Sequence, residues 1–418
     1  MNEKQTEKNL HEGYTLPLWF TNVYIEEILQ DYLKGDSIKV ICFNVAPATA
    51  KGNQYASVIL RVTIEYEQNG KNYFKPIILK IRHQDETTAQ LLEEYDMHLK
   101  EMSFYKRIIP EFHLLLKSIG DKDRLCPNTL TVDHKNHALI FQDLKDSGYE
   151  LADRKSGVDW SHLNLYIQKI SKFHACSVVY KQNTGETFPE FQKGLFHKDA
   201  TGFDTFWKQN MKTLASEVEN WQGFEKYAHK LKKLSDVIVK QGQDIFLRDE
   251  SQFNVLIHGD TWVANMMFKY DENRKPIDVI LIDHQINYFG SFAFDLIYFV
   301  STSTKNDIKF NDFDKVLQLY HQNLQNTLLN LNYQSKIPTL FELKMECVQK
   351  SFFEVISIAT IFPVIINERE DNADIETLVG TNDVAQAFRN QLYTNETVVK
   401  TLKHFLPIWD AKGLLDPL

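Results

Sequence analysis

The N-terminal part of the chain has the pattern of strands joined by a tight turn. Apolar residues occupy every second position from Ser57 to Tyr66, which is typical of a strand with one buried face. The Asn69-Gly70 pair predicts a tight hairpin into a second strand at residues 73–82. Further strands are expected at residues 38–43 and 138–141. The pattern therefore predicts a small sheet.

Helical spacing follows the hairpin. Apolar residues three and four positions apart predict one amphipathic helix over residues 87–109, which Pro110 stops. A polar connector at 142–148 leads into a mainly helical region with one β interruption between 255 and 283. Helices are expected there at 160–180, 205–219, 224–240, 313–330, 340–361 and 394–405. We expect a sheet-plus-helix lobe, a connector and a larger helical lobe.

Composition narrows the class of protein. Of 418 residues, 43% are hydrophobic and 25% are charged, which excludes a disordered or collagen-like chain. The net charge of -9 argues against a nucleic acid or an anionic membrane as partner. Four cysteines without CxxC spacing indicate neither a disulfide framework nor structural zinc and fit a reducing compartment. The polar N-terminus lacks the apolar core of a signal peptide, which favours the cytoplasm.

The most apolar run of the sequence covers residues 355–366 and contains Pro363. It is shorter than the roughly 20 residues that a spanning helix needs. We expect a buried core helix that ends or kinks at the proline, and no membrane span.

Acidic and amide side chains gather around the β interruption. The apolar run 255–257 leads into His258-Gly259-Asp260, which places an acid where a buried strand gives way to a loop. Residues 266–270 and 277–282 then predict a hairpin. Because Asn265 and Asp283 are equidistant from the middle of its turn, we expect them side by side at its open end.

An oxygen-rich pair beside a free carboxylate suits magnesium-assisted phosphoryl transfer. Two oxygen ligands hold a hard cation that keeps its other positions for phosphate and water. A separate carboxylate accepts a hydroxyl proton. Each residue alone would more often cap a turn, since Asp and Asn are favoured there. Their joint spacing and the buried flanking strands favour the chemical interpretation.

This stretch resembles the catalytic loop and metal-binding motif of protein-kinase-like small-molecule kinases, which include aminoglycoside phosphotransferases and choline kinases. The sequence is most similar to the insect ecdysteroid kinase-like family, whose further signatures recur in order along almost the whole chain. They are GNQYAS (52–57), ILKI (78–81), EMSFYKRIIP (101–110), QDLKDSGY (142–149), KFHACS (172–177) and GSFAFDLIYF (290–299). The resemblance implies an α+β, bilobal protein-kinase-like fold, with an N-lobe over residues 1–142 and a C-lobe over residues 143–418.

The resemblance also implies roles for individual residues. Asp260 matches the catalytic base, and Asn265 and Asp283 match the metal ligands. Asp295 and His258 match residues that brace the catalytic loop. His174, on an apolar helical face, is expected to be a satisfied core histidine.

Lys80 matches the strand lysine that holds the nucleotide phosphates. Without the family it would be read as a solvated sheet lysine, since lysine is mostly exposed. Glu101 matches the helix glutamate that pairs with this lysine. Glu94 lies seven residues earlier, on the same face of the predicted helix, and is the second choice. A plain surface glutamate is the alternative for either.

The nucleotide-binding segments depart from the family at several positions. Residues 52–57 match a phosphate-cradling loop that offers backbone amides and the Ser57 hydroxyl. Asn53 and Gln54 replace an acid and an Asn there. The segment from Gln142 to Leu144 matches the interlobe hinge, where main-chain groups of both residues would bind adenine, and Gln142 replaces a Glu. His284 stands where the family has Phe.

The expected activity is that of a small-molecule kinase that uses ATP and Mg²⁺. The segment between Asp283 and Asp295 is too short for the activation segment on which protein kinases dock peptides. The resemblance implies a hydroxylated, lipophilic acceptor, an ecdysteroid or a xenobiotic, in insect hormone inactivation or detoxification. Candidate lining residues, each more often core, are Trp207, Trp262, Phe292, Tyr298 and the run 355–366.

Three other functions stay open. A choline or aminoglycoside-type kinase would share the core but should have an acidic, cation-binding pocket. A catalytically inactive binding protein on the same fold is disfavoured by the intact set Lys80, Asp260, Asn265 and Asp283. A metallophosphohydrolase would need further His or Asp ligands for a second metal.

Overall fold

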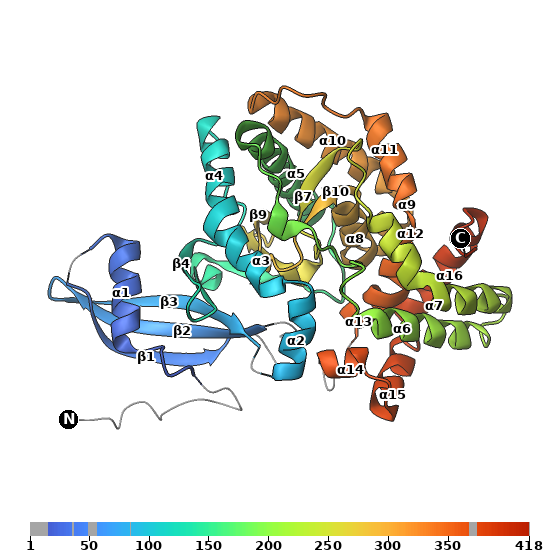
Figure 1. The fold of residues 1–418 in the computed structure, drawn as a ribbon, viewed down its shortest axis with the longest axis horizontal. Helices are drawn as coiled ribbons and strands as arrows, with labels where there is room; N and C mark the ends of the chain where they lie inside the picture. Colours follow the sequence, from blue (N-terminus) through green and yellow to red (C-terminus); the bar gives the residue numbers. More distant parts are fainter. Residues whose placement is uncertain (1–15, 36, 49–56, 84, 368–373, 418) are drawn as a thin grey trace.

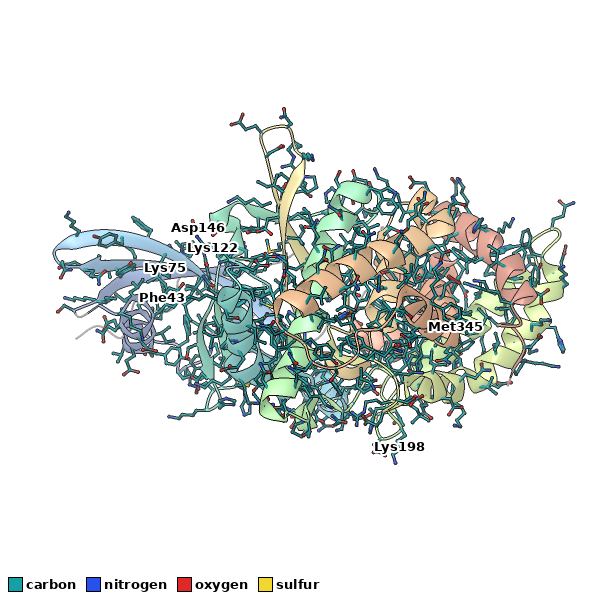
Figure 2. All side chains as sticks on the ribbon, turned by 90° about the horizontal axis from the view of Figure 1, so that it is seen from above. Phe43, Lys75, Lys122, Asp146, Lys198 and Met345 are labelled. Carbon is teal, nitrogen blue, oxygen red and sulfur yellow. The ribbon has the colours of Figure 1, made fainter. Side chains whose placement is uncertain are left out.

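The computed structural model describes residues 16–35, 37–48, 57–83, 85–367 and 374–417. A small lobe built on a sheet and a larger helical lobe lie along its long axis (Figure 1). The view in Figure 2, turned by 90°, shows the same arrangement. The predicted α+β, bilobal fold is confirmed.

The small lobe contains a five-stranded antiparallel sheet. In sheet order its strands are β1 (Lys39–Pro47), β2 (Ser57–Gln68), β3 (Lys71–Arg82), β5 (Ala138–Gln142) and β4 (Thr129–Asp133). On β2 the apolar residues from Val58 to Tyr66 are buried at every second position, as the alternation predicted. They pack against α1 (Asn22–Leu33), a helix that the sequence analysis did not predict.

The predicted single helix over residues 87–109 is wrong. The chain forms α2 (Glu86–Glu94), α3 (Met97–Ser103), the π-helical turn η1 (Phe104–Ile108) and α4 (Ile109–Ser118). Asp96 adopts the left-handed conformation at φ 54°, which ends the first helix and redirects the second.

The prediction that Pro110 stops the helix is also wrong. In η1 the Ile109 amide donates to the Phe104 carbonyl, five residues back. The helical hydrogen-bond pattern therefore shifts by one residue immediately before the proline. Pro110 then stands in the first turn of α4, where its missing N–H costs nothing.

A π-helical turn before a proline occurs a second time, and the predicted helix over residues 340–361 is also divided. Its parts are α11 (Leu340–Gln349), α12 (Phe352–Ile356), the π-helical turn η5 (Ser357–Ile361) and α13 (Phe362–Ile365). The Phe362 amide donates to the Ser357 carbonyl, and Pro363 follows in the first turn of α13. Helical structure therefore continues past Pro363 to Ile365 instead of ending at the proline.

The large lobe packs helices around two small sheets. Five helices match their predicted positions within a few residues: α5 (Trp160–Thr184), α6 (Asp204–Val218), α7 (Glu225–Phe246), α10 (Phe313–Asn330) and α16 (Glu396–Ala411). The others are α8 (Ala293–Ser303), α9 (Asn306–Asn311), α14 (Ile375–Val379) and α15 (Asp383–Leu392). One sheet has the order β6 (Tyr149–Leu151), β8 (Met266–Tyr270) and β9 (Pro276–Leu281), and the other pairs β7 (Asn254–Ile257) with β10 (Tyr288–Ser291).

The chain crosses between the lobes after β5, through the short 3₁₀ helix η2 (Leu144–Ser147) and into β6. The proposed boundary between residues 142 and 143 stays a prediction. Within the described ranges no single helix has both the length and the apolar composition to cross a membrane. One pair, Leu340–Gln349 with Phe352–Ile365, meets those two criteria together, with a bend of 54° between them.

Candidate active site

Asp295 of α8 holds the loop after β7 in place through two hydrogen bonds. Backbone amides of His258 and Gly259 donate to the two carboxylate oxygens of Asp295, each at 2.8 Å. Gly259 has φ 82°, and a Cβ there would lie 2.3 Å from the Ile286 carbonyl oxygen, so the position requires glycine. This bracing role was expected for Asp295.

His258 joins this loop to the end of β9. Its Nε2 donates to the Ile282 carbonyl at 2.9 Å, and its Nδ1 accepts from the Asp260 amide at 3.3 Å. Burial lowers the pKa of His258, so the ring is neutral near pH 7. His174 is a satisfied core histidine, as expected: its nitrogens bond to the Tyr320 hydroxyl at 2.8 Å and to Asp295 at 3.0 Å.

The hairpin pairs one residue out of the predicted register. Met266 lies opposite Leu281, and the Ile282 amide donates to the Asn265 carbonyl at 3.0 Å. Asn265 therefore faces Ile282, and Asp283 is the next residue. At the turn end Tyr270 pairs with Pro276, two residues out of the predicted register, and an irregularity between Lys269 and Tyr270 brings the open end back by one residue.

Asp283 leaves the hairpin in the left-handed conformation, at φ 68°. Its Oδ1 accepts from Lys80 Nζ at 2.6 Å and from the Gln285 amide group. Burial acts to raise the pKa of Asp283, but the Lys80 ammonium outweighs it and lowers that pKa. Asp283 is therefore ionised near neutral pH.

Lys80 lies between two carboxylates and is 4% exposed, which overturns its interpretation as a solvated lysine. Its Nζ is 2.7 Å from Glu101 Oε2 on α3 and 2.6 Å from Asp283 Oδ1. Burial opposes the charge, but these carboxylates raise the pKa of Lys80. Burial also raises the pKa of Glu101 to about 7, so Asp283 is the stronger counterion.

Glu94 does not share this site. Its Oε2 accepts from the amides of Thr201 and Gly202 in the large lobe, at 2.8 and 2.9 Å. The break at Asp96 is the reason, because a seven-residue spacing keeps two side chains on one face only along a continuous helix. Glu101 is thus the glutamate that the structure places on Lys80.

Asp260 is surrounded by neutral donors. Its Oδ1 accepts from the Tyr298 hydroxyl at 2.9 Å, and its Oδ2 accepts from Asn265 Nδ2 at 2.8 Å. Burial and the nearby Asp283 raise the pKa of Asp260 to about 6. Tyr298 was expected only as apolar lining. Its place three residues after Asp295 on α8 was a signal that the two lie on one helical face.

Asn265 and Asp283 each offer an oxygen that makes no hydrogen bond to any described residue, Oδ1 of the amide and Oδ2 of the carboxylate. This pair fits a hard cation such as Mg²⁺, which keeps several waters and takes one or two carboxylates plus phosphate oxygens. Across the described ranges no group of three or more His, Cys, Asp or Glu side chains is arranged to hold a metal.

The expected nucleotide contacts lie along the small lobe and the connector. Ser57 begins β2 on the same face of the sheet as Lys80, since Ile59 is the direct partner of Lys80. Residues 52–56 of the predicted phosphate loop lie outside the described residues. The Gln142 side chain bonds to Ser147 of the connector and to Arg124 and Asn128, which precede β4, and Leu144 is buried. Adenine contacts through their main-chain groups stay a prediction.

A model of the Ecdysteroid kinase-like family matches residues 51–333, which contain every site residue described above. This match covers more than half of the chain. The chain belongs to the ecdysteroid kinase-like family.

A solved structure, that of the Plasmodium vivax ethanolamine kinase, is 12% identical with a TM-score of 0.42. The similarity covers 91% of this chain and 89% of that chain. No curated protein matches the sequence.

This ecdysteroid kinase-like chain has a cavity of about 190 Å³, and Asp260 is one of the residues that line it. Of the candidate lining residues, Trp207, Trp262 and Tyr298 contribute to its wall. The run 355–366 contributes through Ile361, Val364 and Ile365. Phe292 does not: it stacks on Tyr320 in the core, with ring centroids 5.1 Å apart. Among the described residues that line it, Asp260 and Arg154 carry charge.

His284, where the family pattern has Phe, is buried behind Asp283. Its ring stacks on Phe104 of η1 at 4.0 Å, and its Nε2 lies 3.1 Å from Cys126 Sγ. Its buried Nδ1 makes no hydrogen bond to the described part of the chain. Burial lowers the pKa of His284 far below its usual value, so the ring is neutral.

Proposed function

We propose that the protein transfers the γ-phosphoryl group of ATP to a hydroxyl group of a small, largely apolar molecule. The observation that supports this most is the position of Asp260. The carboxylate bonds to Asn265, beside the Lys80–Asp283 pair, and also lines the apolar cavity. Asp260 thus lies between the charged side chains of Lys80 and Asp283, which suit phosphates, and the apolar cavity, which suits an acceptor.

In this reaction the acceptor oxygen forms a bond to the γ-phosphorus, the bond from that phosphorus to the β–γ bridging oxygen breaks, and ADP leaves. Asp260 takes the hydroxyl proton, and Tyr298 holds the carboxylate in orientation. Lys80 binds phosphate oxygens, with Glu101 fixing the ammonium. Asn265 and Asp283 would hold Mg²⁺, which neutralises phosphate charge when bound. Ser57 and the main chain from Gln142 to Leu144 would contact the nucleotide.

We propose an ecdysteroid or a lipophilic xenobiotic as the acceptor. Trp207, Trp262 and the η5–α13 residues make the wall mainly apolar, which suits a ligand with a large apolar surface. A choline or aminoglycoside-type acceptor would call for an acidic wall, whereas the charged residues among the described lining are one acid, Asp260, and one base, Arg154.

A phosphate-transfer screen tests the proposal. Purified protein is incubated with Mg²⁺ and ATP labelled at the γ-phosphate, with hydroxylated steroids, plant glycosides and choline as separate panels. We expect label to be transferred to members of the first two panels, and transfer to stop when EDTA removes the metal. Transfer only to choline would replace the lipophilic acceptor with a cationic one.

The inactive alternative has its own test. Saturating ATP with Mg²⁺ should raise the melting temperature, because a ligand that binds only the native state must stabilise it. An unchanged melting temperature together with no transfer in any panel would favour the inactive binding protein.

A further inference from the structure

Glu94, which the proposed chemistry does not use, makes a direct link between the lobes. It ends α2 of the small lobe, at the junction with the helical lobe (Figure 1). Its Oε2 accepts from two consecutive amides of the large lobe, Thr201 at 2.8 Å and Gly202 at 2.9 Å. Hydrogen bonds to a carboxylate are stronger than those between neutral groups, so this contact fixes the backbone immediately before α6.

Two lysines reinforce the same contact. Lys193 Nζ donates to the Glu94 carbonyl at 3.0 Å and is 2.7 Å from Asp96 Oδ2. Lys100 of α3, which is fully buried, donates to the Lys193 carbonyl at 3.0 Å. Helices α2 and α3 of the small lobe are therefore both bonded to one segment, residues 193–203.

Apolar packing closes the remaining space between that segment and the helices. Tyr95 is buried, and its hydroxyl donates to the Ala200 carbonyl at 3.2 Å and accepts from the Phe203 amide at 3.4 Å. The Tyr95 and Phe203 rings are 5.3 Å apart. A Cβ on Gly202 would lie 2.7 Å from Leu91 Cγ, so the two chains approach closely. Lys198, which Figure 2 shows at the edge of the molecule, is exposed, as are Asp199 and Thr201, and the rest of the segment is buried or half-buried.

The inner side of the 193–203 segment forms part of the acceptor cavity. Leu195 and Phe203 line it, and Phe206 and Trp207 of the adjoining α6 continue the same wall. At the other end of the connection, Glu101 lies one residue after Lys100 on α3 and contacts Lys80. A continuous set of bonded groups thus runs from the cavity wall to the lysine assigned to the phosphates.

We propose that Glu94 is a positioning residue that couples the acceptor cavity to the Lys80–Glu101 pair through the 193–203 segment. This inference rests on the proposed function, because it takes Lys80 to be the nucleotide contact. Nucleotide on Lys80 holds α3 in place, α3 and α2 hold the segment, and the segment holds the cavity wall. The coupling is reciprocal by linkage, so an acceptor in the cavity would favour nucleotide binding by the same factor.

Hydrogen exchange of the full chain tests this without knowledge of the acceptor. Exchange is measured in peptides that span residues 190–210, with and without Mg²⁺ and the non-hydrolysable analogue AMP-PNP. In the wild type, we expect nucleotide to slow exchange at the Thr201 and Gly202 amides by about fivefold or more, the lower end of typical allosteric couplings. In Glu94→Gln, which keeps an acceptor oxygen but loses the charge, we expect faster exchange without nucleotide and less than about a twofold response to it.

Matched variants separate coupling from general loosening. Glu93→Gln changes the neighbouring residue on the same helix, whose carboxylate pairs at the surface with Arg82 at 2.6 Å, and should respond to nucleotide like the wild type. Lys193→Met removes the second connection and should weaken the response as Glu94→Gln does. A response of equal size in Glu94→Gln and wild type would overturn the proposal, as would no response in the wild type.

Calorimetry on the same samples distinguishes the two proposals. If Mg²⁺–AMP-PNP binds the wild type without changing exchange in the 193–203 segment, the coupling is wrong and the kinase function stands. If the nucleotide does not bind at all, the proposed function fails and the coupling fails with it.

Discussion

Asp260 and Asp283 lie at opposite ends of one loop and hairpin, and their surroundings differ in charge. Asp283 faces the ammonium of Lys80 at 2.6 Å, and its pKa is lowered. Asp260 faces a tyrosine hydroxyl, an asparagine amide and an apolar cavity, and burial raises its pKa to about 6. The first environment keeps a carboxylate charged, as a metal ligand must be, and the second prepares one to receive a proton.

The same comparison separates stability from activity. On the Asp283 side charges are buried and paired, so removal of one partner leaves the others uncompensated. On the Asp260 side a carboxylate is held in a place that costs stability, which is common for residues kept for function. The substitutions below test this contrast, beginning with the largest effect.

Replacement of Lys80 by Met should have the largest effect. It leaves Glu101, which is buried, and Asp283, which is partly buried, without their cation. Loss of one partner of a buried pair typically costs about 3–5 kcal/mol of unfolding free energy. Phosphate transfer should also be lost. Urea unfolding of Lys80→Met measures the first effect and the labelled-ATP assay the second.

The double variant Lys80→Met/Asp283→Asn is the control for this pair. It removes the stronger counterion as well and should recover part of the lost stability, while transfer stays absent. Equal stability of Lys80→Met and the wild type would contradict the view that this side depends on paired charge.

Asp260→Asn should lower activity without lowering stability. Transfer should fall by about 10²–10⁴-fold, the usual contribution of a general base. The folded state holds this proton up to about pH 6, whereas an unfolded Asp releases it near pH 3.9, so ionisation of Asp260 costs the native state stability above about pH 4. The variant should therefore be at least as stable as wild type at pH 7.5, with the difference fading towards pH 4. Melting curves at both pH values measure this, and a large loss of stability at pH 7.5 would refute it.

The sequence predicts the local parts of the molecule well. Alternation on β2 identified the buried face, and the family motifs placed Lys80, Glu101 and Asp283 in positions that the fold brings together. These signals are local or rest on a motif shared by the family, so they do not depend on how distant segments pack.

Features that depend on tertiary contacts were missed. The left-handed Asp96 separates Glu94 from Glu101, and the hairpin turns earlier than predicted, with Tyr270 opposite Pro276. Neither position has the glycine that usually signals such a conformation. Pro110 was read as a helix end and Pro363 as a helix end or kink, yet the preceding π-helical turns remove the need for an N–H at either proline.

A smaller effect is expected at Tyr298. Tyr298→Phe removes the hydrogen bond to Asp260 and leaves the ring in the cavity wall, so transfer should fall about tenfold, the equivalent of 1.4 kcal/mol. This bond lowers the pKa of Asp260, so its loss should raise that pKa and move the acidic limb of the pH–rate profile to higher pH. Profiles of kcat for the two proteins measure the shift. An unchanged limb would mean that Tyr298 serves only as lining.

The smallest effect is expected at His284, which lies behind Asp283. Its ring is neutral, stacks on Phe104 and leaves Nδ1 unpaired among the residues that the structure describes, so a phenyl ring of similar volume should replace it at little cost. In His284→Phe the contact with Cys126 is lost, but an unpaired buried polar atom is also removed, so the unfolding free energy should change by less than about 1.5 kcal/mol. Transfer should stay within about threefold of wild type, because no charge on either side of the comparison is altered. If transfer falls by as much as in Tyr298→Phe while the melting temperature is unchanged, the imidazole contributes to the position of Asp283 and is more than a space-filling ring.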